Sequence, residues 1–171
     1  MGTYRNSTLR AFKVAVLSLT LMLLTTYGQT STTVRLPPSL GTKLGQQMTS
    51  DAHDPTFFEE CVRKSGGIQK TVDIELVKLS AATGKQYLVS GKANSGCAYG
   101  ARSPIRWIYE LKNGEFSLIA DIGACDSVLI SSRKRNGYRE IRVGSYSLPD
   151  GRVNYVTFSY NGSEFKCRDC Q

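Results

Sequence analysis

Histidine, paired carboxylates and cysteines are the side chains that could do chemistry in this chain, and His53 is its single histidine. A Ser–His–Asp or Cys–His arrangement would have to use it. His53 lies between Asp51 and Asp54, and the sequence contains no G-x-S-x-G, no H-E-x-x-H and no phosphate-cradling glycine loop. We therefore predict no catalytic residue, no metal site and no cofactor.

Three carboxylates, Glu110, Glu115 and Asp121, lie close together in the sequence and would suit a glycosidase. Each alternates with apolar residues along one predicted hairpin, so we expect them on its solvated polar face. The tripeptide Asn161-Gly162-Ser163 fits a glycosylation acceptor, and it fits a hairpin turn equally well.

Five cysteines follow residue 60. We expect a Cys97–Cys125 disulfide, because the predicted hairpin carries Arg102 near Cys125 and the loop 96–100 can bring Cys97 back to it. Cys61 could pair with Cys167 or Cys170. The C-x-x-C of the tail fits a redox dithiol, but its place one residue from the chain end favours a structural bridge and a spare thiol.

A cluster of basic side chains surrounds one predicted hairpin tip, opposed locally only by Glu140, with Tyr146 in the same stretch. Long cations beside exposed tyrosines suit an acidic protein or an anionic envelope glycan. The same cations could instead protect a strand edge and keep the protein soluble. The candidate binding residues are Arg133, Lys134, Arg135, Tyr138, Arg139 and Arg142.

The elements that must position these residues are mostly strands, and the clearest is the hairpin 105–122. Its turn is Asn113-Gly114, the pair that a type I′ turn favours. Folding about this turn pairs Leu111 with Phe116, Tyr109 with Leu118, Trp107 with Ala120, and Ile105 with Ile122.

The same device recurs at Asn136-Gly137, Asp150-Gly151 and Asn161-Gly162, with a looser hairpin around Thr83-Gly84. It predicts Ile130 opposite Val143, Ile141 opposite Tyr160, and Val143 opposite Phe158. The predicted fold is mainly β (α+β): an antiparallel meander of about eight strands, forming a curved sheet or a small barrel, with one short N-terminal helix.

That helix is predicted after Asp54, which suits an N-cap, with Pro55 at the first helical position and Gly66-Gly67 at the end. Residues 29–50 are rich in Thr, Ser, Gln, Gly and Pro and are predicted to be a flexible spacer. Residues 51–171 then form a single β-rich domain.

Residues 1–28 resemble a secretory signal peptide in pattern, because Arg5, Arg10 and Lys13 precede a short apolar run that ends before Gly28. Its removal would lower the net charge from +8 to +5, with 19 basic and 14 acidic residues left. We expect a periplasmic or secreted protein with no membrane span after leader cleavage and no nucleic-acid partner.

The stretch 87–143 resembles a group of exported bacterial proteins of uncharacterised function. The shared outline is Leu88-Val89-Ser90-Gly91, a Cys-Gly loop at 96–100, Trp107-Ile108-Tyr109, and the Asn-Gly-Tyr-Arg-Glu-Ile-Arg-Val strand at 136–143. That strand is also weakly similar to FG-GAP-like repeats, whose acidic loops bind calcium. Residues 80–85 lack the aspartates of such a loop. The resemblance implies export and fold, and no metal is carried over.

These observations favour an exported, non-catalytic binding module, an enzyme inhibitor or an envelope-polymer binder, that acts through the basic hairpin tip. A structural envelope protein without a discrete ligand is the alternative, and a small extracytoplasmic enzyme that uses His53 or a free cysteine is a third.

Overall fold

A computed structural model describes residues 32–81, 84–95, 97 and 103–170. The predicted leader 1–28, Thr83 and Arg102 lie outside the described residues, as does most of the loop 96–100. The helices are α2 (Pro38–Asp51), α3 (Pro55–Lys64), α4 (Ile68–Thr71) and the 3-10 helix η1 (Ala93–Ser95), and the strands are β1 (Thr32–Thr33), β2 (Val72–Val77), β3 (Lys85–Gly91), β4 (Ile105–Lys112), β5 (Glu115–Ala124), β6 (Ser127–Arg135), β7 (Tyr138–Ser147), β8 (Arg152–Tyr160) and β9 (Phe165–Cys167).

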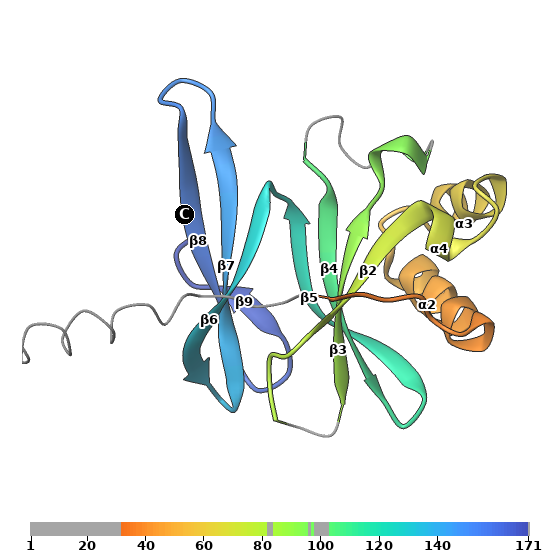
Figure 1. Cartoon of the computed structure of the whole chain (residues 1–171), viewed down its shortest axis with the longest axis horizontal. Coiled ribbons are helices and arrows are strands. Elements are labelled where there is room, and N and C mark those ends of the chain that lie inside the picture. The colour runs from red at the N-terminus through yellow and green to blue at the C-terminus, as the bar shows by residue number, and fades with distance from the viewer. Residues whose placement is uncertain (1–31, 82–83, 96, 98–102, 171) are drawn as a thin grey trace, which may run out of the picture. The chain divides into compact units, whose positions relative to one another are not determined.

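The strands form a meander that is interrupted once. Strands β1 to β5 make a five-stranded sheet (sheet 1), and β6 to β9 make a four-stranded sheet (sheet 2), with each strand antiparallel to its neighbour in sequence (Figure 1). The mainly β, α+β class and the meander are confirmed. Of the two forms left open by the sequence, the barrel is wrong, because the described strands make two open sheets.

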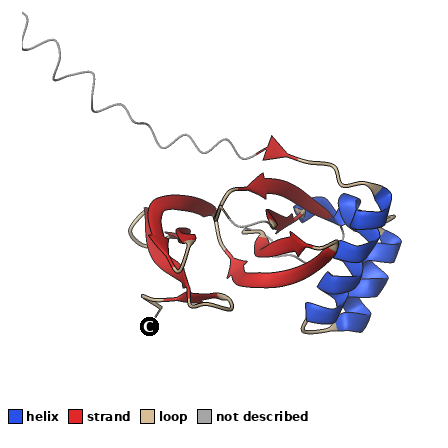
Figure 2. Cartoon of the chain, turned by 90° about the horizontal axis from the view of Figure 1, so that it is seen from below, coloured by secondary structure: helices blue, strands red, loops and turns tan. Residues whose placement is uncertain are grey.

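Both faces of sheet 1 are covered. On one face the helices contribute Leu44, Met48 and Phe58 to a first core with strand residues such as Val89. On the other face Leu88 packs in a second core shared with sheet 2. Figure 2 shows the helices gathered at one side of the strands. Burial of both faces explains the apolar run of β3, because a strand covered on both sides need not alternate.

The main hairpin follows the predicted register only near its turn. Leu111 pairs with Phe116 and Tyr109 with Leu118, as predicted. Two register shifts then place Trp107 opposite Asp121 and Ile105 opposite Ala124, so those two predicted pairings are wrong. Such shifts are β-bulges, which change which face the following residues point to. As a result Leu118 packs in the first core, and Ile119 and Ile122 pack in the second.

In the other hairpins, too, the turns lie where they were predicted but the predicted pairings farther along the strands are wrong. Asn136 and Gly137 have positive φ, 49° and 82°, as a type I′ turn requires. A further irregularity after Ile130 places it opposite Ile141, not Val143. The turn around Asp150-Gly151 is four residues long, so Ile141 pairs with Phe158 and not with Tyr160, and Val143 pairs with Val156 and not with Phe158.

Helix α3 agrees with its predicted start and end. The Asp54 side chain accepts a hydrogen bond from the Phe57 backbone N–H at 3.0 Å, and Pro55 is the first helical residue. The chain leaves the helix through Gly66 and Gly67, both with positive φ. These are the interactions that a capping aspartate and terminal glycines provide.

The spacer prediction is wrong for residues 38–50, and the prediction of one helix is wrong too, because α2 occupies this segment. Pro38 begins α2, and Leu44 and Met48 are buried on one face, four residues apart. Gly41 is buried as well, and a Cβ there would lie 3.0 Å from the Gln69 side-chain nitrogen, so glycine lets α2 approach α4 closely. Tertiary packing therefore outweighs the low helix propensity of glycine and threonine.

Candidate functional site

The turn between β6 and β7 carries most of the predicted binding residues. Arg133, Lys134 and Arg135 are exposed at the end of β6, and Arg139 is half-buried opposite Lys134. We call these four residues the basic tip. The Asn136 side chain donates a hydrogen bond to the Tyr160 carbonyl at 2.9 Å and so ties the turn to β8. The tip is therefore held by a defined turn.

No ion pair joins a basic-tip residue to a carboxylate within the part of the chain that the structure describes. Glu140, the nearest acidic residue in sequence, is buried, and its Oε1 atom accepts hydrogen bonds from Ser159 at 2.9 Å and from Arg168 at 3.2 Å. The Glu140 carboxylate therefore pairs with Arg168 of the C-terminal tail and not with a residue of the tip. The positive charge of the tip stays uncompensated locally, which favours an anionic ligand.

Tyr138 lies apart from this exposed surface, because its side chain is half-buried against the second core. Its ring stacks against that of Tyr160 with centroids 4.1 Å apart and meets the Phe165 ring edge-on. Its hydroxyl donates a hydrogen bond to Glu110 Oε1 at 3.0 Å. An aromatic side chain with one polar atom can fill an apolar layer and still satisfy that atom, and Tyr138 does so between the sheets.

Arg142 is separate from the tip as well. It is exposed on the other side of sheet 2, where its guanidinium carbon lies 4.7 Å from the centroid of the Tyr155 ring. This geometry is a cation–π contact. The structure thus divides the six predicted residues among the basic tip, a half-buried tyrosine between the sheets and a second surface.

A polar cluster joins the two sheets beneath the tip. Glu110 Oε1 accepts from Tyr138 and also from Gln86 Nε2 at 2.8 Å, and Gln86 Nε2 contacts Ser80 Oγ at 3.3 Å. Gly84 makes room for the carboxylate, because a Cβ there would lie 2.7 Å from Glu110 Cδ. The prediction that Glu110 lies on a solvated face is therefore wrong. Burial, and then the hydrogen bond to Glu110, raises the pKa of Tyr138 to about 12.

Replacing Tyr138 by phenylalanine should lower the free energy of unfolding by about 1–2 kcal/mol at neutral pH, because Glu110 loses a hydrogen-bond donor. The raised pKa also adds pH dependence. The unfolded state releases the tyrosine proton near pH 10, while the folded state holds it to about 12. This stabilisation is complete below about pH 10 and is lost as the pH rises to about 12. Urea unfolding at a series of alkaline pH values should show a shallower fall for Tyr138→Phe; equal slopes would contradict the assignment.

The remaining carboxylates do not form a catalytic pair with Glu110. Glu115 makes an ion pair with Lys43 of α2 at 2.7 Å, on the helix side of sheet 1, whereas Glu110 bonds Tyr138 on the side of sheet 2. Asp121 is exposed, as predicted. His53 is exposed beside the helix cap. Among the described residues no group of three His, Cys, Asp or Glu side chains could hold a metal ion.

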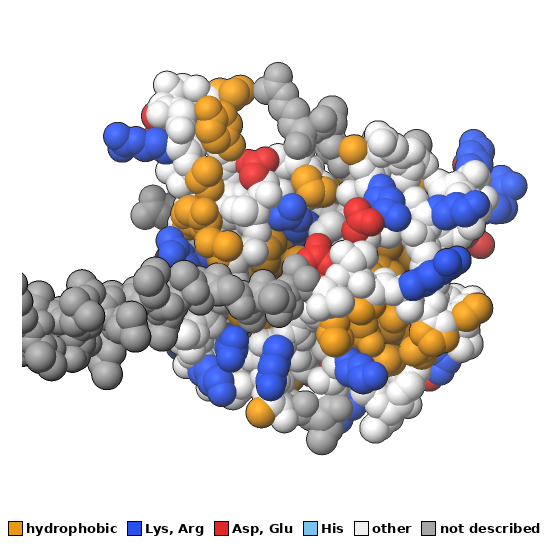
Figure 3. Space-filling view, viewed as in Figure 1, with side chains coloured by type: hydrophobic (Ala, Val, Ile, Leu, Met, Phe, Trp, Pro, Cys, Tyr) orange, Lys and Arg blue, Asp and Glu red, His pale blue; other side chains and the backbone are white. Residues whose placement is uncertain are grey.

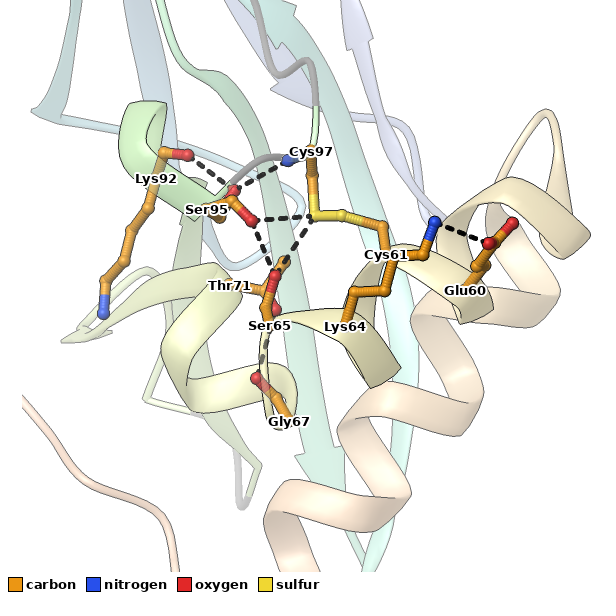
Figure 4. Close-up of a disulfide and its surroundings, with 9 residues drawn as sticks. All are labelled: Glu60, Cys61, Lys64, Ser65, Gly67, Thr71, Lys92, Ser95 and Cys97. Atoms are coloured by element: carbon orange, nitrogen blue, oxygen red, sulfur yellow. Dashed lines mark hydrogen bonds and ion pairs between the residues drawn. A yellow bond between two sulfur atoms is a disulfide. The ribbon is translucent and has the colours of Figure 1, made fainter.

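The disulfides differ from both predicted pairings. Cys61 is bonded to Cys97, with Cα atoms 5.6 Å apart, and Cys167 is bonded to Cys170, with Cα atoms 5.7 Å apart (Figure 4 shows the first). Cys125 is free and buried. The predicted partners lie on opposite faces of sheet 1. Cys61 and Cys97 lie in the first core, whereas Cys125 lies in the second core and Cys167 packs against that second core.

The contacts of these cysteines indicate that they stabilise the fold and do not take part in a reaction. The hydroxyl of Ser65, the residue after α3, donates a hydrogen bond to the carbonyl of Ser95, the last residue of η1, at 2.6 Å. This bond lies beside the Cys61–Cys97 disulfide, so two links tie the end of α3 to η1 and Cys97 (Figure 4). Burial raises the pKa of the Cys125 thiol, although Arg106 opposes this effect. A protonated, buried thiol is a poor nucleophile. The two disulfides indicate a non-reducing environment.

Asn161 uses its side chain within the last turn. Its Oδ1 atom accepts hydrogen bonds from the backbone N–H groups of Ser163 and Glu164, at 2.9 and 3.0 Å. The turn interpretation of Asn161-Gly162-Ser163 is therefore confirmed, and it explains the asparagine without a sugar.

Comparison with known proteins gives no relative: no protein family, curated protein or solved structure matches this chain. The resemblance at residues 87–143 stays a prediction. Within the described residues no helix has the length and apolar character needed to cross a membrane.

Proposed function

We propose that this chain is an exported, non-catalytic binding module whose basic tip binds an anionic macromolecule in the periplasm or outside the cell. The observation that carries the proposal is the uncompensated charge of the tip: Arg133, Lys134 and Arg135 are exposed and make no ion pair among the described residues. The carboxylates closest to the tip are engaged elsewhere, Glu140 by Arg168 and Glu110 by Tyr138 and Gln86. Charges presented in this way raise the rate of encounter with an oppositely charged partner.

Two further observations support the proposal. The two disulfides suit a protein that folds in an oxidising compartment, where the predicted leader would deliver it. The residues that could do chemistry have structural roles: Glu110 bridges the sheets, Asp54 caps a helix and Cys125 is buried in a core. A rigid sheet with a charged turn fits binding better than turnover.

Reversal of the tip charge tests the proposal. The triple variant Arg133→Glu, Arg135→Glu, Arg139→Glu should lose retention on immobilised polyglutamate and heparin and lose its partner in capture from envelope extracts. Loss of at least about tenfold in affinity is expected for three contacts, and wild-type binding should weaken with salt.

The matched control is Arg35→Glu, Arg63→Glu, Lys70→Glu, which changes the net charge equally at exposed positions outside the tip. If both triple variants lose binding equally, only net charge matters and the tip is not the site. Unchanged capture by the tip variant would refute the proposal. Co-fractionation with cell wall and no soluble partner would favour the structural alternative.

A further inference from the structure

The face of sheet 2 that points away from the second core carries an exposed apolar surface. Five of the seven large hydrophobic side chains that are exposed in the described residues lie on it or on the β7–β8 turn. Figure 3 shows hydrophobic side chains gathered over this hairpin at the upper left, with Lys or Arg side chains beside them. The five are Leu129 (46% exposed), Tyr146 (53%), Leu148 (69%), Val153 (41%) and Tyr155 (39%).

Strand register explains why these residues share one face. Val128, Ile130, Ile141, Val143 and Val156 pack in or against the second core. The residues that alternate with them therefore point outward. Leu129 lies opposite Arg142, Gly144 opposite Tyr155, and Tyr146 opposite Val153. Together with Leu148 at the turn they form one surface, which we call the outer face.

Gly144 and Arg142 hold the centre of the outer face in place. A Cβ on Gly144 would lie 2.7 Å from Val153 Cγ1 and 2.8 Å from Tyr155 Cε1, so these side chains lie over the bare glycine. The Arg142 guanidinium, on β7, lies over the ring of Tyr155, on β8. A tyrosine held in this way loses little conformational entropy when a partner covers it.

We propose that the outer face binds a second protein, one that presents an apolar patch with acidic residues around it. Apolar patches with a polar border mark protein contacts, and tyrosine and arginine are the residues enriched at their centres. Three exposed aliphatic side chains favour a protein over a glycan, whose surface is mostly hydroxyl groups. The inference rests on the proposed function and names the class of the macromolecule.

Charge decides against a second copy of this chain. In a two-fold contact each outer face would meet the same face of the other copy, so both sides of the contact would carry the same charges. Arg152 lies near the turn at one end of the face, and the basic tip lies beyond the other end. Two exposed carboxylates lie at the same turn end: Asp150, and Asp126, which accepts hydrogen bonds from the Tyr146 backbone N–H and the Ser103 hydroxyl. With the four cations of the tip and Arg142, the charge around the face is still positive. An acidic surround on the partner would complement these charges, whereas a positively charged copy of this chain would not.

A photo-crosslinking amino acid placed at Leu129 or Tyr146 in the full chain, produced in its native cells, tests the proposal. The control position is Phe57 of α3, whose exposed fraction of 54% matches that of Tyr146. We expect one discrete protein adduct from Leu129 and Tyr146, none from Phe57, and an adduct peptide rich in Asp and Glu. An adduct of two copies of this chain, adducts of equal yield at Phe57, or no protein adduct would overturn it.

The affinity of wild-type and variant chains for the purified partner protein from the adduct then measures how much the outer face contributes to binding. Tyr146→Ala and Tyr155→Ala should each weaken the affinity about tenfold or more, and Phe57→Ala should change it less than about twofold. Two positions are used so that a local folding defect at Tyr155 does not decide the result. If both tyrosine variants bind normally while tip reversal abolishes binding, the outer-face inference falls and the proposed function stands. If adducts form and tip reversal has no effect on binding, the proposal that the tip binds the partner is refuted and the proposal that the outer face binds it is supported.

Discussion

Replacing Cys61 and Cys97 together by alanine should lower the free energy of unfolding by about 4 kcal/mol. The disulfide closes a loop with a sequence separation of 36, and the chain-entropy relation gives about 3.8 kcal/mol for such a loop at 25 °C. It also ties α3 to Cys97, beside the hydrogen bond from Ser65 to η1, so its removal should loosen the helix side of the first core. Urea unfolding under non-reducing conditions measures the effect.

The second disulfide provides the graded control. Cys167 and Cys170 are three residues apart, and the same relation gives about 1.6 kcal/mol for their replacement by alanine. Cys125→Ala should leave the Cys61–Cys97 bond intact and cost only the burial of one small side chain. If Cys125→Ala were as damaging as Cys97→Ala and left Cys61 open to alkylation, the observed pairing would be wrong.

Truncating Ile141 to alanine should cost about 3 kcal/mol. The side chain is fully buried on β7, between sheet 2 and sheet 1, and lies beside Ile130 and Phe158 in the second core. Deletion of several buried carbon atoms removes their transfer free energy and leaves a cavity that the two strands fill only in part. The measurement is the shift in the urea midpoint at constant m-value.

Two further substitutions calibrate that result. Ile141→Val removes one methylene group and should cost about 1 kcal/mol. Val153→Ala on the outer face should change stability by less than about 0.5 kcal/mol, because Val153 is 41% exposed. A cost at Ile141 as small as that at Val153 would mean that the two sheets do not share a core.

The sequence allowed local structure to be predicted wherever backbone chemistry determines it. Asn113-Gly114 and Asn136-Gly137 require positive φ, and the pairs next to those turns, such as Leu111 with Phe116, are correct. Asp54 and Pro55 likewise determine the start of α3. Farther from each turn the register depends on bulges. The bulge near Ile108 has no sequence signature, and with it Ile119 and Ile122 face the second core and sheet 2.

Helix α2 could have been recognised. Leu40, Leu44 and Met48 recur every four residues behind a proline, which is a helical pattern. The glycines and threonines between them obscured it, because they are poor helix formers. The helix forms because its apolar side is buried against α3, α4 and sheet 1.

The positions of some candidate binding residues could be predicted from the sequence, and those of others could not. Clustering of Arg133, Lys134 and Arg135 is local and was visible in the sequence. Other features depend on sheet 1 being covered on both faces, whereas the sequence prediction was made for a sheet with one buried face. These features are the contact of Tyr138 with Glu110 between the sheets and the disulfide partner of Cys97. Sheet 2 covers the other face. The outer face was missed because Leu129, Val153 and Tyr155 resemble core residues in sequence.

Mass spectrometry of the native protein, without reduction and after proteolysis, tests most directly the export and the disulfide pairing on which the proposed function depends. The predicted product lacks residues 1–28, within a few positions. It contains peptides that link Cys61 to Cys97 and Cys167 to Cys170, and it exposes the Cys125 thiol only after unfolding. A native product that begins at Met1 and carries five alkylatable thiols would contradict the account.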